Sequence, residues 1–347
     1  MSATALALVS ATPQVFDSTP PPDTLAACLA PFEDLIVGCT LESDLHDRLS
    51  KHGRIGLVGP SGCGKSSATR YALSQPGVAM LLINVMTEDA TAISNVRDFL
   101  QILVSQLLAR ANTADKLDDK ARDELLAQAT PTIPLTRTQI TNRAQLGGAF
   151  WLLNGGVARE VARQIGGGEA PRAISDLRAA ASDALAIVTA HGLVPVIVAD
   201  DADRLLAATD PRTAATIIRG FFGEVVREIS EQLECGFLVA FNDNYRDGED
   251  PRQGTAGHLH TIAMPTLTSA AELTRIVDLR ASFLSESVST SELASGEAME
   301  ALARLHANEH NHSIRRTLNV LGQALTQAAG DGSDLVGVHH ISAAAAG

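Results

Sequence analysis

Four short apolar runs stand out along the chain, each bounded by glycine or polar residues. They are Arg54–Val58, Val78–Val85, Val194–Ala199 and Gly236–Phe241. Uninterrupted apolar runs of this length are typical of strands in a parallel sheet that is covered on both faces. The pattern therefore predicts four strands that are buried on both sides.

Segments with helical spacing of apolar residues lie next to these runs. We predict helices over Leu41–His52, Ser66–Ser74, Ile93–Ala111, Ile174–His191 and Pro211–Gln232. Strands that alternate with helices indicate an α/β fold, whose ligands bind beyond the carboxyl ends of the strands.

Beyond Pro265 the pattern becomes purely helical. The expected helices cover Ser269–Glu286, Gly296–Asn308 and Ser313–Ala329. We therefore expect a small helical lid domain over 265–330, followed by a C-terminal tail over 331–347.

Two parts of the chain lack a regular pattern. Residues 1–31 contain five prolines among Ala, Ser and Thr, which predicts an extended N-terminal arm. Residues 112–175 combine a mixed-charge stretch with proline- and glycine-rich segments, so we treat them as an insertion. The α/β domain then covers 32–264.

Composition limits the binding partners and the cellular compartment that we expect for the protein. The chain has 347 residues, 45% of them apolar, and a net charge of −13, so its surface as a whole should repel nucleic acid. A locally basic stretch over Ile133–Arg178, with six arginines and three acids, leaves contact with a phosphate backbone open. The four cysteines show no metal or disulfide spacing, and no apolar stretch reaches the roughly 20 residues of a membrane span. We expect a cytoplasmic protein with no membrane partner.

A phosphate-binding motif follows the first apolar run. The segment has the form G-x-x-x-x-G-K-[ST] between a strand and a helix, which is the context that this motif requires. Its glycines let backbone N–H groups surround a phosphate, Lys65 places a charge at the β- and γ-phosphates, and the Ser66 hydroxyl binds Mg²⁺. The predicted nucleotide-binding residues here are Gly59, Pro60, Ser61, Gly62, Cys63, Gly64, Lys65, Ser66 and Ser67.

An acidic pair supplies the remaining chemistry of such a site. Asp200 and Asp201 directly follow the apolar run Val194–Ala199. We expect Asp200 to hold Mg²⁺ together with Ser66, and Asp201 to orient the attacking water. Taken alone, the pair could equally cap the next helix.

The order of these pieces resembles the AAA+ P-loop ATPases, most closely the bacterial ORC/Cdc6-like members, transposon target selectors and regulatory (STAND-like) ATPases. The resemblance covers about Phe32 to Ala329. It implies a parallel sheet of strand order 5-1-4-3-2 with a helical lid, ATP or ADP with Mg²⁺ as ligands, and a homo-oligomer that forms with ATP.

The resemblance also implies roles for residues outside the loop. The segment Ile36–Glu42 is similar to the one that lines the adenine pocket, with Val37 and Gly38 as the contacts. Asn242 corresponds to the polar sensor near the γ-phosphate. Arg315 corresponds to the lid arginine, with Arg316 as the alternative register.

Two departures from the family pattern bear on catalysis. The acidic strand ends in Asp-Asp instead of Asp-Glu, which favours slow hydrolysis. The stretch GHLHTIAMP has no arginine where a finger that acts on the neighbouring subunit is usual, which leaves Arg227, Arg246 and Arg252 as candidates.

Two functions remain open at this stage. The first is an ATP-hydrolysing module that oligomerises and remodels or recruits a partner macromolecule. The alternative is a slowly hydrolysing, nucleotide-gated switch or scaffold that regulates a separately encoded effector protein. A GTPase is disfavoured because the four lysines lie in no N/T-K-x-D motif, and the spacing His306, His310 and His312 leaves a zinc site as a minor alternative.

Overall fold

A computed structural model describes residues 30–86, 90–111, 114–129, 173–200, 202, 211–242, 258–284 and 288–346. The expected N-terminal arm up to residue 29, residues 130–172 of the insertion, Asp201, Arg246 and Arg252 lie outside the described residues. The chain forms two compact units. One contains Gly59–Tyr71, Met264–Gly347 and the described residues up to Glu42, and the other contains Ser43–Val58 and Ala72–Ala263.

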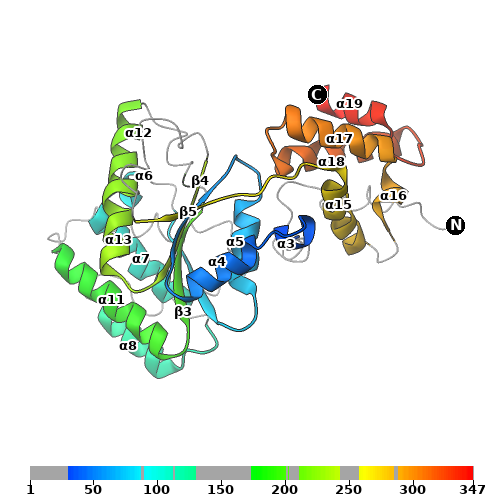
Figure 1. Ribbon diagram of the computed structural model, residues 1–347. Helices are drawn as coiled ribbons and strands as arrows, with labels where there is room; N and C mark the ends of the chain where they lie inside the picture. Colours follow the sequence, from blue (N-terminus) through cyan, green and yellow to red (C-terminus); the bar gives the residue numbers. More distant parts are fainter. Residues whose placement is uncertain are drawn as a thin grey trace. The chain divides into compact units, whose positions relative to one another are not determined.

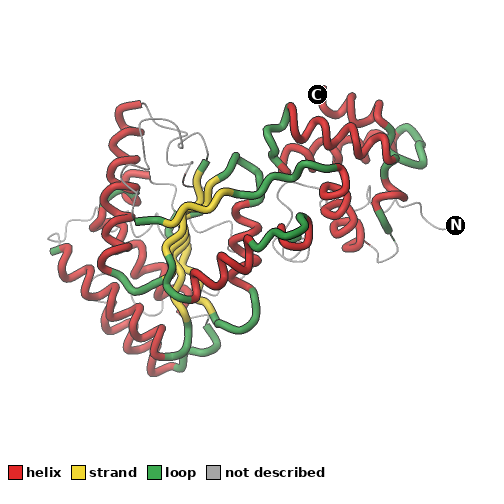
Figure 2. The backbone as a smooth tube through the Cα atoms, in the orientation of Figure 1, coloured by secondary structure: helices red, strands yellow, loops and turns green. Residues whose placement is uncertain are grey.

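The second unit is built on a parallel sheet of five strands in the order β2-β3-β4-β1-β5 (Figures 1 and 2). All four neighbouring pairs are parallel. Read from its other end, this is the predicted order 5-1-4-3-2, so the prediction of an α/β P-loop fold of AAA+ type is confirmed. The strands are β1 (Arg54–Val58), β2 (Met80–Asn84), β3 (Val194–Ala199), β4 (Gly236–Phe241) and β5 (His260–Ala263).

Burial explains which strands the apolar pattern reveals. All six residues of β4 and five of the six in β3 are buried, in keeping with their central places in the sheet. Strand β5 pairs with β1, but three of its four residues are exposed. It therefore carries no apolar run, and the hydrophobic pattern does not locate it.

Helices cover the sheet of this unit. In Figure 1, α7, α11 and α13 lie on one side of the strands and α4 on the other. The apolar faces of α7, α11 and α13 share one core, in which Phe222 stacks edge-to-face on both Phe221 and Phe241. The helices are α4 (Leu41–Ser50), α6 (Ala90–Ile93), α7 (Val96–Ala111), α8 (Asp119–Ala129), α11 (Ile174–Ala190), α12 (Pro211–Ile218) and α13 (Val226–Gln232).

The predicted helix Pro211–Gln232 is not a regular α-helix throughout. A π-helical segment, η4 (Arg219–Val225), separates α12 from α13. It begins where Gly220 comes so close to the Ser94 carbonyl that a side chain at this position would overlap it. The wider turn therefore occurs beside a backbone-to-backbone contact and keeps Phe221 and Phe222 in the core.

The first unit is mainly helical. It contains α3 (Phe32–Leu35), α15 (Ala270–Leu284), α16 (Thr290–Leu293), α17 (Gly296–Asn308), α18 (Ile314–Gly330) and α19 (Val338–Ala346), with α5 (Lys65–Ser74) beginning in it. The three helices predicted beyond Pro265 occur within two residues of the expected bounds. The expected tail 331–347 contains a further helix, α19, which packs on α17 and α18 and buries Ile341. None of the helices in the described ranges is long and apolar enough to cross a membrane.

Candidate nucleotide-binding site

The glycines of the loop 59–66 give it its shape. Gly62 and Gly64 have φ angles of +79° and +106°, which residues with a side chain rarely adopt. The loop ends where α5 begins at Lys65, so the first N–H groups of this helix point back toward the loop. Such a strand–loop–helix arrangement is suited to an anion.

Lys65 is held beneath the loop. Its side chain is only 4% exposed, and Nζ donates hydrogen bonds to the carbonyl oxygens of Gly59 at 2.6 Å and Pro60 at 3.1 Å. An ammonium group has three N–H donors, and these two neutral acceptors occupy two of them. These two hydrogen bonds to the backbone fix the position of the Lys65 ammonium group on the loop.

The other predicted residues of the loop differ in exposure. Ser61 is exposed, whereas Cys63 is buried and its N–H donates to the Pro60 carbonyl at 3.3 Å. Ser66 and Ser67 are half-buried in the first turn of α5.

The start of α18 contacts the loop directly. The backbone N–H of Arg315 donates to the Gly62 carbonyl at 3.1 Å, so the loop satisfies one of the donors that a helix start leaves open. Ser313 is the N-cap and accepts from the Arg316 N–H at 3.4 Å. A Cβ on Gly62 would overlap the Ser313 hydroxyl oxygen and lie 2.9 Å from the Arg315 Cβ. Arg315, the predicted lid arginine, is thus also the residue whose backbone joins the lid helix to the phosphate loop.

Helix α3 contacts the loop from another direction. The ring of Phe32 lies 3.1 Å from the position of a Cβ on Gly64, and Phe32 itself is 2% exposed. Shortly after α3, Val37 is 90% exposed and Gly38 has a φ of +80°. An apolar side chain so exposed is suited to a flat, apolar ligand group, and the predicted adenine contact stays a prediction.

Two further predicted residues belong to the sheet unit. Asp200 is the first residue after β3, and Asn242 the first after β4, whose last residue Phe241 pairs with Val58 of β1. Both are half-buried, and their strands are neighbours and parallel, so both lie at the carboxyl edge of the sheet. Their roles stay predictions, as does that of Asp201.

The histidine spacing does not make a zinc site. His306 and His310 each place Nδ1 on the hydroxyl of Thr317, at 2.8 and 3.1 Å. The described residues contain no group of three or more His, Cys, Asp or Glu that could hold a metal ion. The zinc alternative is therefore wrong for these three histidines, of which His306 and His310 instead share the Thr317 hydroxyl.

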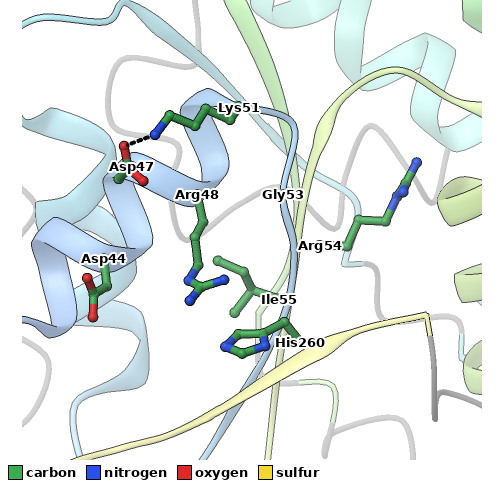
Figure 3. A pocket seen from close by; sticks show the side chains of 8 residues that line it. All are labelled: Asp44, Asp47, Arg48, Lys51, Gly53, Arg54, Ile55 and His260. Atoms are coloured by element: carbon green, nitrogen blue, oxygen red, sulfur yellow. Dashed lines mark ion pairs between the residues drawn. The ribbon is translucent and has the colours of Figure 1, made fainter.

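A pocket of about 370 Å³ lies elsewhere, in the sheet unit (Figure 3). It is lined by α4, by the turn that follows it and by the first residues of β1 and β5, hence at the amino edge of the sheet. Arg48 and His260 extend over Ile55, and Lys51 is paired with Asp47 at 2.5 Å. Ligands of parallel α/β sheets bind at the opposite, carboxyl edge, so this pocket is separate from the candidate site.

Other predicted surfaces are only partly described. Within the basic stretch, Arg178 is paired with Glu228 of α13 through Nε and Nη2, the latter at 2.9 Å. That hydrogen bond raises the pKa of Arg178. The stretch 133–172 lies outside the described residues. Arg227, one finger candidate, is paired with Glu231 at 3.0 Å on its own helix.

Sequence reasoning missed three residues of the site. Ser313, Phe32 and Glu42 contact or support the loop segments through tertiary packing. Glu42 is fully buried, and this burial raises its pKa although the N–H groups of Phe32 and Glu33 donate to it. A serine before a helix was the one available signal, since Ser313 begins an apolar-periodic segment.

Comparison with known proteins gives matches only among solved structures. No protein-family model and no curated protein matches the chain. The ORC2 protein of Aeropyrum pernix matches in its ADP form with a TM-score of 0.46 and 14% identity, over 88% of this chain and 66% of that one. The same protein in ADPNP–ADP complexes matches with 0.46 and 15%, over 88% and 65%. Cdc6p of Pyrobaculum aerophilum matches with 0.42 and 13%, over 93% and 67%.

The chain thus spans about two thirds of the length of the solved structures that it matches. Its own sheet defines the architecture, a parallel α/β P-loop fold with the AAA+ strand order.

Proposed function

We propose that this protein binds ATP with Mg²⁺ and hydrolyses it as an AAA+ module. The observation that carries the proposal is the buried Lys65, held by two carbonyls under a loop that two left-handed glycines shape. A phosphate that replaces these neutral acceptors offers the ammonium stronger, charge-assisted hydrogen bonds. A turn that served only to join β1 to α5 would not need a buried cation.

We assign the remaining parts of such a ligand to the other predicted residues of the two units. Ser66 and Asp200 offer hard oxygen atoms, the ligand class that Mg²⁺ takes. When bound, Mg²⁺ neutralises charge on the β- and γ-phosphates. We assign Asp201 and Asn242 to orienting the attacking water, Arg315 to the γ-phosphate, and the exposed Val37 and Gly38 to the base.

The contact between loop and lid supports a coupling of nucleotide state to lid position. Because the Gly62 carbonyl accepts from the Arg315 N–H, a change in the loop is transmitted to the start of α18. We propose that this coupling drives homo-oligomerisation with ATP and acts on a partner macromolecule in the cytoplasm. The net charge of −13 favours a protein partner over nucleic acid.

A second function is favoured by one feature of the sequence. An aspartate at 201 reaches less far than the glutamate usual in the family, which suits a nucleotide-gated switch that hydrolyses ATP rarely and regulates a separate effector.

Steady-state phosphate release distinguishes the two functions. The enzymes to compare are wild type, Lys65→Ala, Asp201→Ala and the control Lys120→Ala, whose side chain is 85% exposed on α8. A turnover of about one per minute or faster, lost in the first two variants and kept in the control, supports the ATPase. Tight binding without turnover supports the switch, and release unaffected by Lys65→Ala contradicts both.

A further inference from the structure

Helix α3 is a single turn whose two ends are held by side chains from other helices. A helix of four residues satisfies almost none of its own backbone groups, so its position depends on outside partners. It stands directly before the exposed Val37 and Gly38. Whatever fixes α3 also fixes where this base-side segment begins.

Arg275 of α15 holds the C-terminal end. Its Nη1 donates to the Leu35 carbonyl at 2.7 Å and to the Asp34 carbonyl at 3.3 Å. These are the carbonyls that a helix end leaves without an intrahelical donor, and a guanidinium supplies a positive charge where the helix dipole is negative. The contact spans 240 residues of sequence and joins the first lid helix to the base-side segment.

Glu42 holds the N-terminal end. Its Oε1 accepts from the Phe32 N–H at 2.7 Å and its Oε2 from the Glu33 N–H at 3.3 Å. Phe32 is the residue that packs on Gly64 of the phosphate loop. The two ends of α3 therefore have different partners. Glu42 holds the N-terminal end, which packs on the phosphate loop, and Arg275 holds the C-terminal end, which leads to Val37.

We propose that Arg275 is a positioning residue that fixes Ile36–Gly38 for the nucleotide base and so ties base recognition to the lid helix α15. The proposal rests on the proposed nucleotide-binding function. It assigns base binding and phosphate binding to different supports. Loss of Arg275 makes the base-side segment less ordered, whereas Lys65 and the loop glycines keep their geometry through Glu42 and Phe32.

Binding of two ligands tests this separation. Affinities for Mg-ATP and for inorganic triphosphate with Mg²⁺ are measured by calorimetry on wild type, Arg275→Gln, Arg275→Lys, Glu42→Gln and Lys65→Ala. The control is Arg304→Gln, at an exposed position of α17 in the same unit. Inorganic triphosphate uses only the residues assigned to the phosphates and Mg²⁺, whereas ATP also uses the base-side segment.

We expect Arg275→Gln to bind ATP about tenfold more weakly, the factor that corresponds to losing one charge-assisted hydrogen bond, with unchanged affinity for triphosphate. Arg275→Lys should recover part of the loss because Nζ can still donate to a carbonyl, and Glu42→Gln should weaken both ligands. Melting curves that match the control confirm that the variants are folded.

Equal loss of ATP and triphosphate affinity in Arg275→Gln, or no loss of either, overturns the inference and leaves nucleotide binding intact. If wild type binds neither ligand, or if Lys65→Ala binds both as well as wild type does, the proposed function fails and the inference with it.

Discussion

His306 offers a quantitative test of how α17 packs against the start of α18. It is 2% exposed within α17, and its Nδ1 lies 2.8 Å from the Thr317 hydroxyl, which itself donates to the Ser313 carbonyl at 3.0 Å. The hydroxyl hydrogen is thus used, so Nδ1–H must be the donor to Thr317. Nε2 is buried without a partner among the described residues. Burial first, and then the nearby His312 and His310, lower the pKa of His306 to about 4.

The sign of the effect follows from proton linkage. Since the folded pKa of His306 lies below its ordinary value of 6.5, the unfolded chain binds the proton more readily between about pH 4 and 6.5. The free energy of unfolding therefore rises with pH through this window, and the contribution is complete above pH 6.5. The difference between 6.5 and about 4, at about 1.4 kcal/mol for each pH unit, amounts to about 3 kcal/mol.

The perturbation is His306→Gln, because glutamine can donate to Thr317 but does not titrate. Urea unfolding measured from pH 4 to 7 should show that wild type gains about 3 kcal/mol more stability across this range than the variant does. His339→Gln, at an exposed position of α19, should keep the wild-type rise. A variant curve that runs parallel to wild type across the window would refute the buried, neutral state of His306.

Two glycine substitutions test close approaches. Gly62→Ala places a methyl group on the Ser313 hydroxyl, at a position with left-handed backbone conformation. We expect urea unfolding to show a loss of at least about 1–2 kcal/mol of stability from the backbone conformation alone. Calorimetry should show weaker ATP binding. Gly220→Ala overlaps the Ser94 carbonyl beside the π-helical segment and should destabilise the sheet unit by about 1–3 kcal/mol without altering the phosphate loop; a neutral result would show that the π-turn relaxes freely.

The strands could be predicted wherever burial requires a run of apolar residues in the sequence. The bounds of β1, β3 and β4 agree with their apolar runs to the residue. The location of β5 could not be predicted, because an edge strand with exposed side chains needs no apolar run. The break between α6 and α7, inside the predicted helix Ile93–Ala111, does have a local signal that the apolar spacing overlooks. Asn95 caps α7, because its Oδ1 accepts from the N–H groups of Arg97 and Asp98.

The candidate site shows the same division. The loop could be predicted because its glycines and Lys65 lie together in sequence and their chemistry requires that spacing. Its supports could not, since Phe32, Glu42 and Ser313 reach the loop region through the fold. In sequence, Glu42 is indistinguishable from a solvated acid on an amphipathic helix, and only its burial and its two backbone donors reveal its task.

The most direct test is equilibrium binding of Mg-ATP to wild type, Lys65→Ala and Lys120→Ala. The proposed function predicts saturable binding by wild type and by Lys120→Ala. Lys65→Ala should bind roughly 30- to 150-fold more weakly, since it loses charge-assisted hydrogen bonds of about 2–3 kcal/mol. Equal binding by all three proteins, or no binding by wild type, would contradict it.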